Sequence, residues 1–144
     1  MRSRLALLLG AAALAAWTVG LAAQDHDHDA GEHHHPEAAA MKNPVKPTPE
    51  SIAAGKKLYD AQCVTCHGET GKGDGKMAAS ITGAKPSDLT VASWKHGSTD
   101  GEIFTLIRDG SKGTGMRGYA ARMKPEDIWN VVNYLKTLAP KSGR

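Results

Sequence analysis

The sequence has few of the residues that usually build a large core. Its 144 residues include one phenylalanine, three tryptophans, three tyrosines and only two cysteines. Two cysteines permit one disulfide at most, and so few aromatic residues leave little material for a hydrophobic core. No segment alternates apolar and polar residues convincingly, as a half-buried strand would. We therefore expect an all-α domain, and a domain this small often needs a cofactor or a covalent staple.

A strong excess of one charge is also missing. From residue 50 onward, 14 Lys and Arg residues stand against 10 Asp and Glu residues. This mildly basic balance could steer an acidic partner, but it is too weak and too dispersed to predict a nucleic-acid partner. No grouping of nucleophile, acid and base is visible along the chain, which argues against an enzyme.

The first 23 residues have the pattern of a secretory signal peptide or an N-terminal anchor. Arg2 and Arg4 precede an uncharged apolar run, Leu5 to Ala23, that ends in small residues. The run also reaches about 17–20 residues, the minimum for a spanning helix, so an uncleaved anchor is the alternative. Both interpretations predict an exported chain. A cleaved signal peptide would leave it in the periplasm, whereas an anchor would hold it at the outer face of the inner membrane.

Residues 24–48 are expected to form a His-rich disordered linker. Histidines 26, 28 and 33–35 lie among Asp, Glu and Pro, with almost no large apolar side chain. Such a segment buries too little surface to offset its ordering entropy. Its imidazoles suit loose binding of copper, zinc or nickel, and a soluble spacer is the alternative.

The remaining residues, 49–144, are expected to fold as one domain with long Gly-rich loops. Thr48 can cap one helix, and Thr99 with Glu102 has the spacing of a capping box for another. Apolar residues recur every three or four positions in the last helix. Long loops in a compact domain usually wrap something or carry function. The three expected helices cover residues 48–63, 98–110 and 123–140.

The stretch "CVTCH" contains both cysteines, Cys63 and Cys66, and His67. A structural disulfide would close only a tiny loop, which stabilises little. A thioredoxin-like exchange site needs a βαβ pattern, which the sequence lacks. A zinc site would require the adjacent Cys66 and His67 to converge on one ion and a fourth ligand from elsewhere. The spacing C-x-x-C-H fits covalent haem attachment, since two thiols can reach two vinyl groups and the next imidazole can lie under the iron.

A six-coordinate haem iron needs one more ligand. Neutral sulfur or imidazole can bind from the distal side, and the Gly-rich loop "KGTGMRGYAARM" can bring its backbone close to a flat ring. This loop favours Met116. The other candidates are Met41, Met77, Met123 and His96.

These residues resemble the class I c-type cytochromes, monohaem proteins found mostly in bacteria. The resemblance covers Pro49 to Leu138 through "GKKLYDAQCVTCHGETGKGDG", "KPSDLT", "DGEIFTLIRDG" and "GTGMRGYAARMKPEDIWNVVNYLKTL", in the family's order and spacing. It implies the cytochrome c fold: three to four short helices and Gly-rich loops wrapped round one haem c, attached through Cys63 and Cys66. It also implies His67 as the proximal ligand and Met116 as the distal one.

The resemblance assigns further roles in packing and in orienting the haem. Gly55 and Tyr59 match the family's glycine and aromatic residue on the first helix, and Tyr134 matches the aromatic residue that packs across them. Pro86 matches a proline whose carbonyl accepts a hydrogen bond from the His67 ring, and Trp94 is expected near a haem propionate. Where many relatives have proline after the distal methionine, this chain has Arg117.

The function implied is that of an electron carrier whose iron cycles between Fe(II) and Fe(III). Its partners would be exported or membrane-bound redox proteins. The alternative is a haem c subunit of a larger periplasmic dehydrogenase or terminal oxidase complex.

Overall fold

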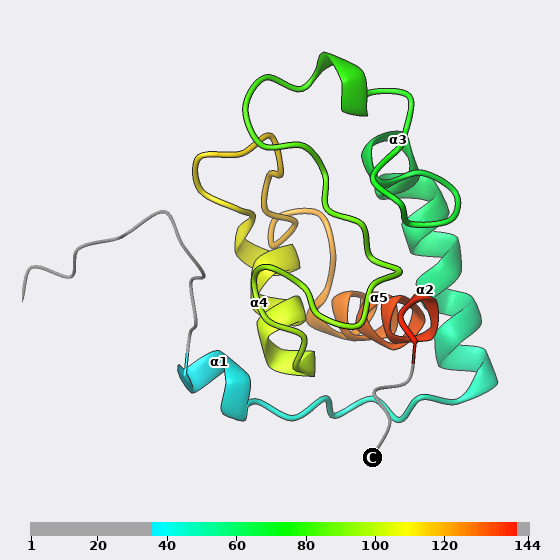
Figure 1. The fold of residues 1–144 in the computed structure, drawn as a ribbon. Helices are drawn as coiled ribbons and strands as arrows, with labels where there is room; N and C mark the ends of the chain where they lie inside the picture. Colours follow the sequence, from blue (N-terminus) through cyan, green and yellow to red (C-terminus); the bar gives the residue numbers. More distant parts are fainter. Residues whose placement is uncertain (1–35, 141–144) are drawn as a thin grey trace, which may run out of the picture.

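The computed structural model describes residues 36–140 and shows an all-α domain, as the sequence predicts (Figure 1). The β structure among these residues consists of two isolated bridges, Ala84 to Thr114 and Gly110 to Arg117. No helix among them is long and apolar enough to cross a membrane. The elements are α1 (Pro36–Ala40), α2 (Pro49–Gln62), α3 (Val64–His67), the 3₁₀ helix η1 (Ala78–Ser80), α4 (Asp100–Asp109) and α5 (Pro125–Leu138).

The three expected helices are α2, α4 and α5, and the first two begin at the predicted caps. The Thr48 hydroxyl accepts from the Ser51 backbone N–H at 3.2 Å, and the Ser51 hydroxyl accepts from the Thr48 backbone N–H at 3.0 Å. On α4 the Glu102 N–H donates to the Thr99 hydroxyl at 3.3 Å, and the Thr99 N–H donates to the Glu102 carboxylate at 3.0 Å. These side chains satisfy backbone donors that a helix start otherwise leaves unpaired.

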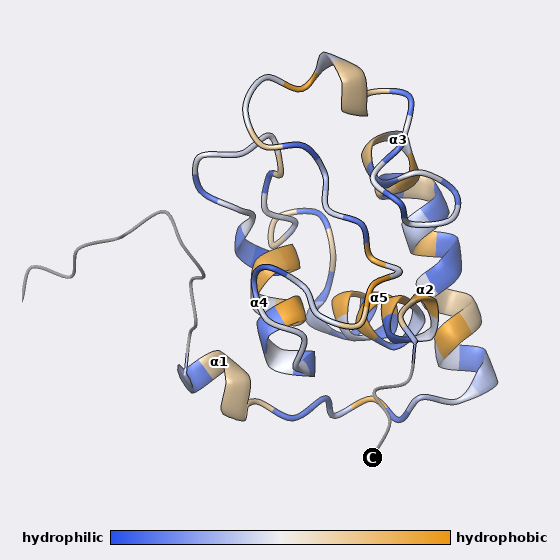
Figure 2. Cartoon of the chain, viewed as in Figure 1, coloured by the Kyte–Doolittle hydropathy of each residue, from blue (hydrophilic) through white to orange (hydrophobic). Residues whose placement is uncertain are grey.

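The core lies where α2 and α4 pack against α5. Helix α5 is buried along most of its length, and Phe104 on α4 stacks on its Trp129 with ring centroids 4.0 Å apart. In Figure 2 the most hydrophobic parts of α4 and α5 lie where the two helices meet. Tyr59 on α2 is fully buried, and its ring centroid lies 5.2 Å from that of Tyr134 on α5.

Helices α2 and α5 approach most closely at Gly55. A Cβ atom at this position would overlap the backbone carbonyl of Asn130 and would lie 3.0 Å from the Cβ of Tyr134. The predicted close crossing of two helices at this glycine is therefore confirmed. It accounts for a residue that costs about 1 kcal/mol in a helix interior relative to alanine.

The second half of the predicted disordered linker is ordered, which corrects its boundary at residue 48. Ala38 of α1 is only 2% exposed, and its carbonyl leaves no room for a side chain at Gly101 of α4. The Asn43 side chain donates to that of Asn133 at 2.8 Å, and Asn133 donates to the carbonyl of Val45 at 3.1 Å. Composition gives little sign of this attachment, because it depends largely on backbone contacts and amide pairs, to which only Met41 and Val45 add apolar packing against the core.

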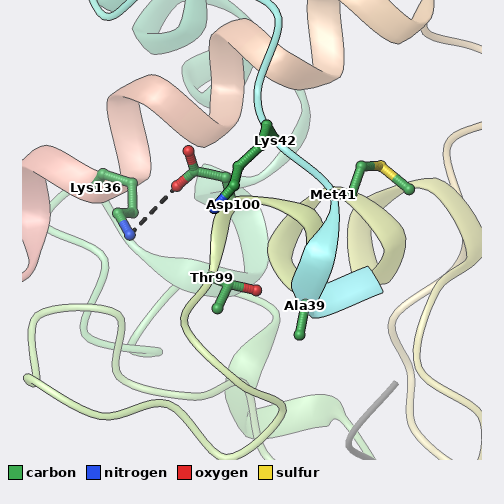
Figure 3. A pocket seen from close by; sticks show the side chains of 6 residues that line it. All are labelled: Ala39, Met41, Lys42, Thr99, Asp100 and Lys136. Atoms are coloured by element: carbon green, nitrogen blue, oxygen red, sulfur yellow. Dashed lines mark ion pairs between the residues drawn. The ribbon is translucent and has the colours of Figure 1, made fainter. Parts of the chain in front are cut away.

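The ordered linker segment also forms one wall of a pocket of about 200 Å³ at the α1 end of the molecule (Figure 3). Within it Lys136 of α5 pairs with Asp100 of α4 at 3.3 Å. Met41, an alternative candidate for the distal ligand, lines this pocket, but neither Met116 nor the attachment residues do. The residues that do are Ala39, Met41, Lys42, Thr99, Asp100 and Lys136.

Replacing Gly55 tests the close crossing. In Gly55→Ala we expect the free energy of unfolding to fall by about 2 kcal/mol, because the added methyl group forces α2 away from α5. Helix propensity alone predicts the opposite, a gain of about 1 kcal/mol. Guanidinium unfolding of the haem-loaded protein measures the difference. The matched control is Ala54→Gly, at an exposed position one residue earlier, which should lose about 1 kcal/mol. A stabilised Gly55→Ala variant would contradict the crossing.

Candidate functional site

The attachment segment, residues 63–67, is a single turn of helix that follows directly on α2. The backbone N–H groups of Cys66 and His67 both donate to the carbonyl of Cys63, at 3.1 and 2.9 Å. Residues three apart in a helical turn lie on one side of it, so the two thiols share a face. Both are free and half-buried. Burial, reinforced by the nearby Cys66, raises the pKa of the Cys63 thiol to about 11. At neutral pH Cys63 is therefore a protonated thiol, unlike the low-pKa thiolates of exchange sites.

The Gly-rich loop after the attachment segment folds back over it. Gly73 donates to the carbonyl of His67 at 2.9 Å, and Gly75 donates to that of Cys66 at 3.2 Å. A side chain at Gly75 would meet the backbone of α3, so only glycine permits this approach. On the other side the Tyr59 hydroxyl donates to the carbonyl of Gly68 at 2.6 Å. The Gly-rich loop and the Tyr59 hydroxyl thus both hold the turn in place through its backbone carbonyls.

His67 presents a neutral imidazole. Burial lowers its pKa, and an interaction with the backbone of Ser87 opposes this effect in part. Its buried Nδ1 makes no hydrogen bond of ordinary geometry. The bond to the Pro86 carbonyl stays a prediction; in this structure that oxygen lies against Gly73. The loop 81–90 does reach the histidine, where the Ser87 backbone interacts with the ring.

Met116 lies half-buried against the hydrophobic core in a loop with a well-defined backbone. Its N–H donates to the Thr114 hydroxyl at 3.1 Å, and its carbonyl accepts from Ser111 at 3.0 Å. The next residue, Arg117, forms an antiparallel bridge with Gly110. The loop therefore has backbone restraints of its own at the position where many relatives carry proline.

Two further contacts bring the loop that carries Met116, residues 110–124 (the Met116 loop), beside the segments around the attachment turn. Ala84 and Thr114 form a parallel bridge, which places the loop that follows η1 alongside the Met116 loop. The Tyr119 hydroxyl donates to the carbonyl of Gln62 at 2.9 Å, directly before Cys63. Figure 1 shows both loops at the same end of the molecule as α3. Sequence reasoning missed Tyr119, because an aromatic residue three positions after Met116 gives no sign of a partner 57 residues away.

The other predicted or candidate residues occupy different environments. Trp94 is half-buried against the core, and its indole N–H donates to the Val91 carbonyl at 3.1 Å. A propionate contact for Trp94 stays a prediction. Met123 is buried in the core, only 8% exposed, while Met77 is 49% exposed. Between these extremes, Met116 combines partial burial with a Gly-rich loop.

Comparison with known proteins identifies the family. The family described as Cytochrome c matches residues 52–139. The chain belongs to the cytochrome c family. Membership of this family assigns the chain a covalently bound haem c. The residues fit this group, since the free thiols have C-x-x-C-H spacing with His67, and both Cys63 and the half-buried Met116 pack against the apolar core.

Curated relatives include both a small cytochrome and subunits of larger complexes. Cytochrome c-554(547) of Halothiobacillus neapolitanus is 35% identical over 91 residues, which span 60% of this chain and 94% of that protein. The cbb3-type cytochrome c oxidase subunit CcoP of Azospirillum sp. is 29% identical over 87 residues, 60% of this chain and 28% of the subunit. This cytochrome thus spans little more than a quarter of the oxidase subunits it matches.

Solved structures agree on the fold. A chain of the Kuenenia stuttgartiensis reducing HAO-like protein complex superposes with a TM-score of 0.64 and 30% identity, over 71% of this chain and 49% of that one. Cytochrome cL from Methylophaga aminisulfidivorans superposes with a TM-score of 0.52 and 19% identity, over 63% of this chain and 55% of that one, which shows the fold alone. The all-α cytochrome c fold expected from the sequence is therefore confirmed.

Replacing the cysteines one at a time tests the attachment. Cys63→Ser and Cys66→Ser should each retain a single thioether, with a shifted pyridine haemochrome spectrum, because each thiol bonds one vinyl group. In the double variant acid–acetone should extract the haem completely. Thr65→Ser, inside the same turn, is the control and should keep the native spectrum. Haem that acid–acetone removes from the native protein would contradict attachment through these residues.

Proposed function

We propose that this cytochrome carries electrons between exported redox proteins with His67 and Met116 as axial ligands and without a reaction of its own. The observation that supports it best is the placing of Met116. Its loop is bridged to residue 84 and reaches the end of α2 through Tyr119, so the sulfur and the imidazole come from segments held beside one another. Haem c, when bound, supplies the iron that changes between Fe(II) and Fe(III).

The chain's own residues would keep that iron in one environment. The neutral imidazole of His67 and the neutral sulfur of Met116 would fill both axial positions, which raises the reduction potential relative to histidine alone. With both positions filled, substrates and oxygen have no free coordination site. The backbone bonds at Gly73, Gly75 and Met116 restrain the loops around the haem, so little rearrangement need accompany electron transfer.

The comparisons support a separate carrier first and a complex subunit second. The haem domain corresponds to 94% of cytochrome c-554(547), a small cytochrome. The match to CcoP and the superposition on a chain of the HAO-like complex favour the alternative, a haem subunit of a larger oxidase or dehydrogenase. Export is proposed from residues 1–23, the predicted signal peptide or anchor, which lie outside the described residues. Residues 24–35, which hold all five histidines of the His-rich segment, lie outside them too.

The distal ligand can be tested by substitution. In Met116→Ala the ferric protein should lose the weak long-wavelength absorption band of sulfur–iron bonding, and its reduction potential should fall because a sulfur ligand is removed. Visible spectra and redox titration measure both effects. Met123→Ala is the matched control: it should lower stability by about 2–5 kcal/mol, as buried methionines do, and keep the band. A band that survives in Met116→Ala and vanishes in Met123→Ala would reverse the assignment.

The partner surface proposed is the exposed side of the Met116 loop. Residues 110–124 carry Lys112, Arg117, Arg122 and Lys124 and no acidic residue, and all four side chains are exposed. A partner with an acidic surface complements this loop, and attraction between the two surfaces speeds their encounter.

Arg117→Glu tests that surface with small redox probes of opposite charge. At low salt it should slow electron transfer to hexacyanoferrate(III) by roughly threefold and speed it with a cationic cobalt complex, because local charge steers encounter. The effect should shrink as ionic strength rises. Lys46→Glu changes the net charge equally in the segment between α1 and α2, which Figure 1 shows at the other end of the molecule, and should alter both rates much less. Equal effects of the two variants would point to net charge rather than to this surface.

A further inference from the structure

Tyr119 connects three separate parts of the chain. Its backbone N–H donates to the carbonyls of Ile107 and Arg108, both at 3.0 Å, which fixes it to the end of α4. Its own carbonyl accepts from Arg122 and Met123 at 2.9 Å, so it also begins the turn that leads into α5. The side chain, held at its base by these bonds, reaches the last residue of α2.

The hydroxyl of Tyr119 closes the Met116 loop onto the attachment segment. It donates to the Gln62 carbonyl at 2.9 Å, and Gln62 directly precedes Cys63. The guanidinium of Arg122 lies over the ring, 4.7 Å from its centroid, and covers it from one face. Burial raises the pKa of the hydroxyl, so it stays protonated and able to donate throughout the neutral range.

The Met116 loop cannot move away from the attachment segment at Tyr119 without breaking this hydrogen bond. Met116 is three residues before Tyr119, and its nearest backbone restraints, Ser111 and Thr114, belong to its own loop. Those restraints shape the loop but do not tie it to the attachment segment. The Tyr119 bond does so across 57 residues of sequence.

We propose that Tyr119 is a positioning residue: its hydrogen bond to Gln62 holds the Met116 loop closed, and thereby keeps the sulfur on the iron against competing ligands. This role rests on the axial position proposed for Met116. It concerns the equilibrium between closed and open loop rather than the identity of the ligand. A ligand that displaces the sulfur binds the open form, so its apparent affinity reports the open fraction.

Imidazole titration of the ferric haem-loaded protein measures that fraction. In Tyr119→Phe we expect imidazole to bind about fivefold more tightly than in the native protein, the factor that one ordinary hydrogen bond represents. Phenylalanine keeps the ring and its packing, so the variant loses the hydroxyl alone. The sulfur–iron absorption band should remain in the absence of imidazole.

Tyr59→Phe is the matched control, since it removes the same kind of bond on the proximal side. The Tyr59 hydroxyl donates to the Gly68 carbonyl at 2.6 Å, also beside the attachment segment but without contact to the Met116 loop in the bonds it makes. This variant should unfold at lower guanidinium concentration and bind imidazole within twofold of the native affinity.

The outcomes separate the two proposals. If the absorption band depends on Met116 but Tyr119→Phe binds imidazole as the native protein does, only the role of Tyr119 is wrong. An equal gain in imidazole affinity in both tyrosine variants would also overturn it, because general destabilisation would then suffice. If Met116→Ala leaves the band intact, the ligand assignment fails and the positioning role falls with it.

Discussion

The close contact of α2 with α5 at Gly55 is the constraint on which the haem site depends. Helix α2 runs straight into the attachment turn, so its direction determines where Cys63 and the residues after it lie. The Met116 loop runs into α5 through the turn at Tyr119. A side chain at Gly55 would separate the helices, and with them the two segments that supply the proposed ligands. The stacked Phe104 and Trp129 then attach α4 to the same helix.

Hydrogen bonds to backbone carbonyls hold the segments near the site in place. Tyr59 and Tyr119 each donate to a carbonyl at one end of the attachment segment, at Gly68 and Gln62. Between them the Gly-rich loop closes over the turn through its own backbone. A domain with so few large side chains gains order in this way, because backbone groups buried without partners would cost free energy. The haem adds apolar surface that the sequence itself lacks.

Local signals in the sequence predicted the helices and the attachment chemistry well. Helices α2 and α4 each begin with a threonine whose side chain pairs with the chain three positions on, and α5 begins with a proline; these signals are visible in the sequence. The linker boundary was wrong because Ala38 and Asn43 are small or polar, and their burial depends on which surfaces α4 and α5 present. The Pro86 bond stays a prediction for a related reason: the position of a carbonyl within a loop is set by the neighbouring backbone, and composition carries no record of it.

The sequence by itself determined the cofactor, because C-x-x-C-H needs only residues that share one helical turn. It also determined the helix limits and the glycine at the crossing, which are consequences of neighbours in the chain. Only the tertiary structure decided how the distal loop is held. The bond from Tyr119 to Gln62 joins residues 57 positions apart, and the bridge at Thr114 joins two loops without regular patterns. Such contacts depend on how the helices pack, so no local spacing encodes them.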